Sequence, residues 1–277
     1  MKKILLFSTV ALSSMFFACS SDDSSTPTED NSQPKKRVVV AVLDNEGNVL
    51  NAQSADANTT KDYVIAGSGF QHRVLIEDFT GAWCGWCPRV TQSIEDLEKT
   101  DHDKIIGIGL HNGDKFAFTP HENNLYTAIA NKIGVDISKG RSFPFAVLNR
   151  AEQWEAATSN TMKTNQALAL AKSNSEIGIK ISSELGDTSG KINVSLKFNA
   201  SYSDLKYVVY VVEDNLILAQ ENYTSNFGGK GKKKEFVHNG VVKAVNDVNG
   251  VTVTNSTSGS EFSSGDISVT YKKFENK

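Results

Sequence analysis

Apolar residues along the chain follow two different patterns. Nearly continuous apolar runs, typical of buried strands, occupy 38–43, 73–79, 104–110 and 145–148. Beyond Ser175 the apolar positions instead alternate, with Gly, Asp and Asn between the runs, as in 177–181 and 192–198. The pattern predicts an α/β domain over 37–173, followed by an all-β sandwich of immunoglobulin type over 174–277 that folds independently.

Three helices are expected in the first of these domains. Val90, Ile94 and Leu97 recur at helical spacing and predict a helix directly after residue 87. A capping box with proline at the first helical position predicts a second helix from Pro120 to Ile133. The stretch 151–172, rich in Ala, Gln and Lys, is expected to form the closing helix.

The N-terminal sequence is typical of an export signal. Lys2 and Lys3 precede an apolar run that ends at Phe17 and is too short to span a bilayer. The junction before Cys19 resembles a bacterial lipobox, which makes 1–18 a lipoprotein signal peptide and Cys19 the residue that carries the acyl chains. An ordinary secretory peptide with an incidental cysteine is the alternative.

Residues 19–36 are expected to be a disordered tether, because their polar composition cannot bury enough apolar surface to fold. Its start, Ser20-Ser21-Asp22-Asp23, resembles the signal that moves lipoproteins of the Bacteroidota to the outer face of the outer membrane. The same residues serve equally well as a solvated linker. We therefore expect a lipid-anchored protein of the outer membrane, on its periplasmic or cell-surface face.

Composition narrows the choice of partners. The 277 residues are 39% apolar and 22% charged, with a formal charge of −3, which is ordinary for a soluble protein and argues against a nucleic-acid partner. The run 228–234 lacks the residue order of a phosphate loop and is expected to be a solvated hairpin loop. No cofactor is expected.

The Cys84-Gly85-Trp86-Cys87 sequence is the sharpest chemical signal. It follows a buried strand and precedes a helix, whose N-terminus stabilises a thiolate and lowers its pKa. Cys84 is then the attacking sulfur, and Cys87, three residues on, is the resolving sulfur.

The cysteine pair has two other interpretations, a zinc site and a structural disulfide. Zinc would need two more ligands, and the five histidines show no paired spacing, so no metal is expected. An inert structural disulfide stays open, because an exported protein meets an oxidising compartment.

The string from Val74 to Pro88 resembles the active-site segment of thioredoxins. The resemblance implies a thioredoxin-like fold, in which Asp78 falls on the buried acid beneath the resolving thiol and Trp83 on the tryptophan beside the nucleophile. A buried carboxyl has a raised pKa and can take the proton of Cys87. A carboxylate exposed at the strand end is the alternative for Asp78.

Phe143-Pro144 matches the proline that thioredoxin folds keep in the cis form opposite the cysteines. Such a proline leaves the preceding backbone free to pair with an extended substrate. Trp83, Trp86, Phe143 and Pro144 are therefore expected to bind substrate. His111, at a strand end, is expected either to face the site or to serve as a hydrogen-bonding loop residue.

The whole chain resembles the outer membrane protein 28-related lipoproteins, a Bacteroidota family with a thioredoxin-like domain followed by a β-rich one. Besides the cysteine segment, the resemblance rests on Phe143-Pro144, Asn149-Arg150, Val211-Val212-Glu213-Asp214, Gln220 and Phe236-Val237-His238-Asn239. It implies a mature protein at the outer membrane and supplies no substrate. Glu213, Asp214 and His238 are expected to fix turns or an interdomain contact.

Two functions follow from these observations. The first is a thiol–disulfide oxidoreductase of intermediate potential that acts on exported protein or peptide substrates, together with a redox partner protein. The second is a surface adhesion or binding lipoprotein, with a structural Cys84–Cys87 disulfide and a β domain that grips a partner.

Overall fold

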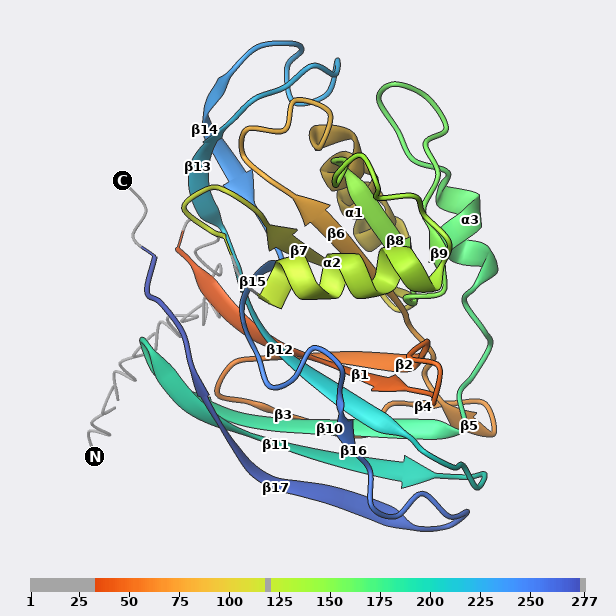
Figure 1. Ribbon diagram of the computed structural model, residues 1–277. Coiled ribbons are helices and arrows are strands. Elements are labelled where there is room, and N and C mark those ends of the chain that lie inside the picture. The colour runs from red at the N-terminus through yellow and green to blue at the C-terminus, as the bar shows by residue number, and fades with distance from the viewer. Residues whose placement is uncertain (1–32, 118–120, 275–277) are drawn as a thin grey trace, which may run out of the picture. The chain divides into compact units, whose positions relative to one another are not determined.

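The computed structural model describes residues 33–117 and 121–274 (Figure 1). The predicted signal peptide, the lipid-attachment residue Cys19 and most of the predicted tether lie outside the described residues. Regular structure begins at Lys35, two residues before the expected start of the first domain. The described residues make up one compact unit.

A nine-stranded mixed sheet unites strands from both predicted domains (Figure 1). Its order is β2-β1-β12-β15-β7-β6-β8-β9, and β16 pairs with β12 outside this path. The strands from the first segment are β1 (Lys35–Leu43), β2 (Val49–Asp56), β6 (Val74–Thr80), β7 (Ile105–His111), β8 (Phe145–Leu148) and β9 (Glu152–Gln153). Those from the last segment are β12 (Lys206–Asp214), β15 (Val241–Val245) and β16 (Val251–Thr252).

The second sheet has four strands, in the order β17-β11-β10-β3. They are β3 (Thr60–Lys61), β10 (Ile177–Leu185), β11 (Ser189–Phe198) and β17 (Glu261–Thr270). Smaller sheets pair β4 (Ile65–Ala66) with β5 (Gly69–Phe70), and β13 (Leu216–Gln220) with β14 (Lys233–His238). The alternating pattern of the last segment did predict strands, and the chain is mostly β.

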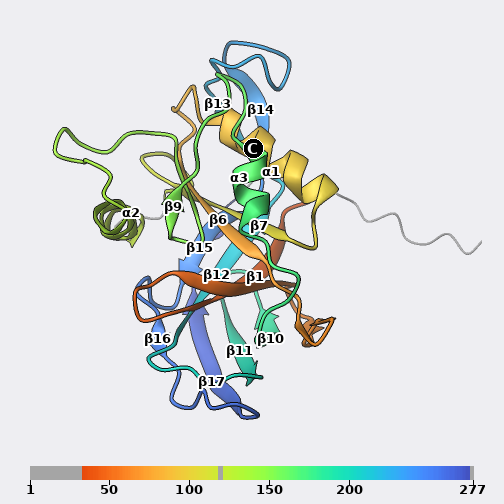
Figure 2. The same cartoon turned by 90° about the vertical axis from the view of Figure 1, so that its right-hand side faces the viewer.

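The expected division at residue 173 does not separate two cores. The four-stranded sheet packs on Val38, Val40 and Val42 of β1 and on alternate residues of β12, all within one apolar cluster. The sandwich is therefore completed by the large mixed sheet and not by a second sheet of its own (Figure 2). Periodicity reveals strands but not their partners, because pairing is a long-range property.

Helices cover the rest of the mixed sheet. α1 (Pro88–Thr100) and α3 (Thr164–Ala169) pack on one face of β6, β7 and β8, whereas α2 (His121–Lys132) packs on the other. The first two helices lie where periodicity places them. β6 and β7 run parallel, and β8 runs antiparallel to β6.

The expected helix over 151–172 is wrong for most of its length. Residues before α3 form β9 and a loop closed by a bridge between Ala156 and Met162. Trp154 is 1% exposed and donates its indole N–H to the carbonyl of Lys163 at 2.8 Å. Burial of this ring folds the segment back on itself and overrides its helix-favouring composition.

A buried ionic cluster fastens β6 to β12. Arg150 donates to both carboxylate oxygens of Glu77, each at 3.0 Å, and Tyr210 donates its hydroxyl to Glu77 at 2.6 Å. Arg150 also donates to the carbonyl of Val248 at 2.8 Å. Glu77 is fully buried and depends on these partners, since an unpaired charge in the interior is costly.

Replacing Arg150 with Ala is expected to lower the free energy of unfolding by about 3–5 kcal/mol, because Glu77 would remain buried without its counter-ion. Urea unfolding followed by tryptophan fluorescence measures this. Lys163→Ala, which removes the exposed ion pair with Glu155, is the control and should cost no more than about 1 kcal/mol. Equal effects of both substitutions would contradict the assignment.

A fragment of residues 174–277 is expected not to unfold cooperatively, although its sequence pattern by itself predicts an independent domain. The fragment lacks β1, whose valines complete the core of the sandwich. Circular dichroism during heating, with the full mature chain as control, tests this. A sharp transition of the fragment would restore the two-domain interpretation.

Candidate functional site

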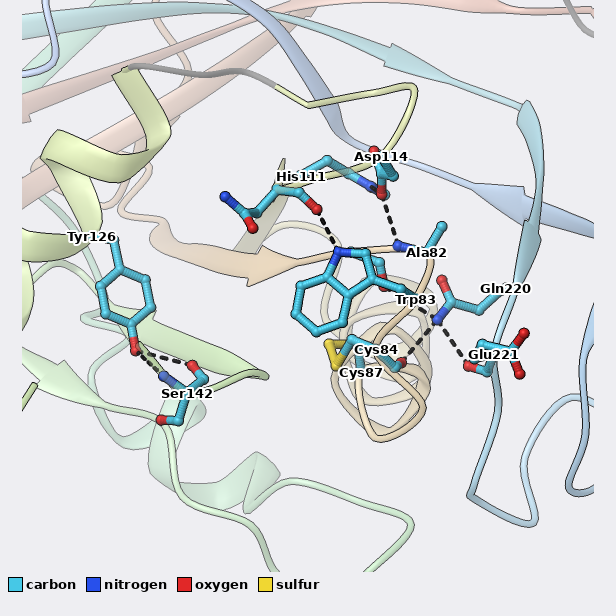
Figure 3. Close-up of a disulfide and its surroundings, with 12 residues drawn as sticks. Ala82, Trp83, Cys84, Cys87, His111, Asp114, Tyr126, Ser142, Gln220 and Glu221 are labelled. Atoms are coloured by element: carbon cyan, nitrogen blue, oxygen red, sulfur yellow. Dashed lines mark hydrogen bonds and ion pairs between the residues drawn. A yellow bond between two sulfur atoms is a disulfide. The ribbon is translucent and has the colours of Figure 1, made fainter. Parts of the chain in front are cut away.

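The cysteine pair lies between the end of β6 and the start of α1 (Figure 3). Cys84 and Cys87 form a disulfide, with Cα atoms 5.4 Å apart. Cys87 is the N-cap residue of α1 and Pro88 occupies the first turn, so Cys84 lies just before the helix. The pair thus occupies the positive end of the helix dipole, the position that favours a thiolate.

Both sulfur-bearing residues are buried in this oxidised form. Cys84 is 4% exposed and Cys87 is 1% exposed. The larger exposed fraction of Cys84 agrees with its role as the outer sulfur, but the two fractions differ little. Any thiol that attacks the disulfide must therefore displace neighbouring groups.

Asp78 lies on the face of β6 that α1 covers, and is 3% exposed. Its Oδ1 atom has no hydrogen-bond partner. Burial raises the pKa of Asp78 to about 8, and the positive charge of Arg89 offsets only part of this effect. The carboxyl can therefore change its protonation state close to neutral pH, as a proton carrier must.

A cavity of about 40 Å³ with both polar and apolar walls adjoins Asp78. It exists because Gly109, the β7 partner of Asp78 in the parallel register, has no side chain to fill the space. Since one water needs about 10–15 Å³ by this measure, the cavity has room for roughly three. Gln220 and His111 also line it, so polar groups surround the carboxyl.

His111 borders the same cavity from the end of β7. Its Nδ1 lies 2.8 Å from Oδ2 of Asp114, which also accepts the backbone N–H of Ala82 at 2.7 Å. Although burial raises the pKa of Asp114, these hydrogen bonds outweigh it and hold the pKa below its ordinary value. His111 therefore ties the cavity to the segment that carries Cys84.

His238 packs beside His111, with ring centroids 5.2 Å apart. Burial, reinforced by the neighbouring His111, lowers the pKa of His238 to about 3, so its ring is neutral. Its Nε2 contacts the carbonyl of Leu218 at 3.2 Å. His238 thus fixes β13 against β14, as the expected structural role requires.

Aromatic side chains surround the disulfide. Trp83, 47% exposed, donates its indole N–H to the carbonyl of Asn112 at 2.7 Å and meets the ring of Phe143 edge-on at 5.2 Å. The Phe143-Pro144 peptide bond is cis. Trp86 is 40% exposed. The structure thus brings the four predicted substrate-binding residues to one region.

The loop between β13 and β14 also reaches the cysteine segment, which sequence reasoning missed. Gln220 donates its side-chain amide to the carbonyl of Cys84 at 2.9 Å (Figure 3), and the ring of Tyr223 meets Trp86 edge-on at 5.8 Å. Gln220 belongs to the motifs that carry the family resemblance, whereas no pattern marks Tyr223. A contact across more than 130 residues leaves no local trace.

Two further findings concern residues 33–117 and 121–274. No group of three or more His, Cys, Asp or Glu side chains is placed to hold a metal ion. In the same residues, none of the helices combines the length and apolar character needed to cross a membrane.

Fold and site together define a mostly β protein, built on a mixed sheet, with a disulfide at the carboxyl end of a buried strand. Residues 136–274, half of the chain, match the family described as outer membrane protein Omp28. The chain belongs to this family, which confirms the resemblance seen in the sequence and associates the protein with the outer membrane. The matched residues include Pro144 and Gln220 but neither Cys84 nor Cys87.

One solved structure shows a similar fold. HBP35 of Porphyromonas gingivalis is 19% identical, with a TM-score of 0.52, and the match covers 74% of this chain and 65% of that one. The chain thus spans slightly less than two thirds of that protein. Protein AGR_C_4864 from Agrobacterium tumefaciens is 17% identical, with a TM-score of 0.43, over 71% of this chain and 78% of the other. No curated protein matches.

Replacing Asp78 with Asn is expected to stabilise the oxidised protein increasingly as pH rises. The folded-state pKa of Asp78, about 8, exceeds the value of about 3.9 in an unfolded chain. Folding therefore favours the protonated form, and its stabilising contribution is complete below about pH 4 and lost as pH rises toward about 8. The neutral amide carries no such penalty.

The difference in unfolding free energy between variant and wild type should grow by up to about 1.4 kcal/mol per pH unit within this window. Denaturant titrations at about pH 5, 6 and 7 measure it. A difference that stays constant with pH would mean that Asp78 titrates outside the window.

Proposed function

We propose that the protein is a thiol–disulfide oxidoreductase that acts on exported proteins or peptides. The observation that carries the proposal is a Cys84–Cys87 pair at the N-terminus of α1, together with the buried carboxyl of Asp78 on the face of β6 that this helix covers. A structural disulfide has no need of a titratable acid beside it. A proton carrier of raised pKa is what exchange through Cys87 requires.

The order of elements supports a thioredoxin-like arrangement around the pair. β6, α1 and β7 form a parallel unit, α2 follows on the opposite face, and β8 and β9 return antiparallel before α3. The cysteines follow β6, and Pro144 directly precedes β8, as the thioredoxin resemblance implies.

Reduction of a substrate proceeds in two exchanges. The Cys84 thiolate attacks one sulfur of the substrate disulfide, forms a mixed disulfide and releases the other substrate sulfur as a thiolate. Cys87 then transfers its proton to the Asp78 carboxylate, and its thiolate attacks the sulfur of Cys84. The Cys84–Cys87 disulfide forms, the second substrate thiolate leaves, and two electrons have passed to the substrate.

The reverse sequence oxidises a substrate dithiol, so the same groups serve either direction. Turnover requires a second dithiol or disulfide protein that resets the pair. The cavity beside Asp78, which His111 also lines, has room for the waters that would return its proton to solvent.

A binding lipoprotein with a structural disulfide is the second candidate. The observation in its favour is the burial of both cysteines behind Trp83 and the β13–β14 loop. In this alternative the disulfide would hold the loop and rim in place for a partner, and Asp78 would have no chemical role.

We also propose that acyl chains on Cys19 anchor the protein to the outer membrane, with 20–34 as the tether. The lipobox-like junction and the polar composition behind it support this. A tether of this kind would let the disulfide site reach substrates away from the membrane surface.

The reduction potential of the Cys84–Cys87 pair separates the two candidates. Equilibration with dithiothreitol or glutathione buffers should give a value between about −270 and −120 mV, the range of catalytic pairs. A value below about −300 mV would identify a structural disulfide and favour the binding lipoprotein.

Single cysteine variants complete this test. With a fluorescent disulfide peptide, Cys87→Ser should accumulate the mixed disulfide, since the resolving thiol is gone. Cys84→Ser is the matched control, and should form little adduct because Cys87 is 1% exposed. Equal trapping by both variants would refute the assigned roles.

A further inference from the structure

The loop that joins β13 to β14 forms a wall beside the disulfide. The backbone N–H of Glu221 donates to the carbonyl of Ala82 at 2.8 Å, and that of Tyr223 donates to the carbonyl of Gly85 at 2.7 Å. With the amide of Gln220 on Cys84, three hydrogen bonds fix this loop to the cysteine segment. The loop's side chains therefore lie beside the cysteine segment, where a substrate bound at Cys84 can contact them.

Internal hydrogen bonds hold the loop in one conformation. The buried side chain of Asn222 donates to the carbonyls of Asn226 and Gly229, each at 2.8 Å, and accepts the backbone N–H of Thr224 at 2.9 Å. Asn160 accepts the backbone N–H of Ser225 at 2.9 Å. A surface that is already ordered binds a ligand without the entropy cost of ordering.

The loop completes a cluster of exposed aromatic rings. Among the large hydrophobic side chains that the structure describes, the exposed aromatic ones are Trp83, Trp86 and Tyr223, and all three border the disulfide. Tyr223 is 50% exposed. Clustered exposed aromatic rings mark recognition surfaces, because they supply a large contact area with little loss of conformational freedom.

The same loop carries positive charge. Residues 221–235 contain four lysines against two glutamates, in a chain whose formal charge is −3. Lys230 and Lys232 are exposed and flank Gly231, whose N–H is bonded to Asn222. The Nζ atom of Lys232 lies 3.5 Å from Oε1 of Glu221, which is two residues before Tyr223. The Arg141 guanidinium lies 5.7 Å from the ring centre of Phe143, the residue before Pro144.

We propose that the loop 221–232 determines substrate specificity, and that it selects segments of exported proteins in which an apolar side chain next to the cysteine is flanked by acidic residues. Tyr223 and Trp86 contact the apolar side chain, while Lys230 and Lys232 attract the carboxylates. This inference rests on the proposed oxidoreductase function and names the substrate class of that site.

Two disulfide peptides with the same core sequence and either acidic or basic flanks provide the test. The reduced full mature chain, in neutral detergent micelles, should reduce the acidic peptide with a kcat/KM about tenfold higher, and added salt should diminish this preference. Lys230→Glu combined with Lys232→Glu should abolish or reverse it. Tyr223→Ala should lower kcat/KM for both peptides alike and leave the charge preference intact.

Lys191→Glu combined with Lys197→Glu is the matched control, since it makes the same change in net charge on β11 of the four-stranded sheet. It should preserve the preference. A preference lost equally in control and loop variants, or absent in wild type, would overturn the proposal.

Reduction of hydroxyethyl disulfide, which is small and uncharged, tests the oxidoreductase function separately from the substrate specificity. If the wild type reduces this compound but treats both peptides alike, the specificity proposal fails and the oxidoreductase function stands. If the wild type reduces neither the compound nor the peptides, the function fails and the specificity proposal fails with it.

Discussion

The antiparallel pairing of β1 with β12 is the constraint on which the rest of the structure depends. It runs in continuous register from Lys35 opposite Asp214 to Leu43 opposite Lys206. Alternate residues of β1 enter two different cores, one shared with the four-stranded sheet and one shared with α2. Neither the first nor the last segment therefore has a complete core without the other.

This pairing also places the loop between β13 and β14. β12 leads directly into β13, and β14 leads directly into β15, which lies next to β7. The hairpin is thus held at both ends by the central sheet, and Asp214 strengthens its base through Arg37 at 2.9 Å and the N–H of Gly240 at 2.6 Å. Because the base is fixed, the loop is presented to the cysteine segment at one position.

Local pattern predicted those parts of the fold that depend on local physics. β6, β7, β8, α1 and α2 appear where apolar runs and helical spacing place them, and Asp78 is buried, as expected of it, on the face of β6 that α1 covers. The sequence did not reveal that β12 and β15 complete the first sheet, nor that Tyr223 lies against Trp86. Both depend on which distant strands meet, and a strand's own alternation carries no such information.

The helix prediction for 151–163 was wrong for a different reason. The composition of this segment favours a helix, but burial of the Trp154 side chain stabilises the folded-back conformation more than helix propensity stabilises a helix. The cavity beside Asp78 likewise could not be predicted from the sequence. It arises because Gly109 has no side chain, and this becomes important only when β7 pairs with β6 and places Gly109 opposite Asp78. Site features that consist of empty space are thus the hardest to infer from a sequence.

The separation of paired strands has a consequence for the making of the protein. Arg37 of β1 and Asp214 of β12 are 177 residues apart, and at a synthesis rate of about 5–20 residues per second β12 follows β1 by roughly 10–35 s. During that interval β1 presents an unpaired, apolar edge that can associate with other chains. The pairing on which the fold depends thus leaves β1 open to association with other chains until β12 is in place.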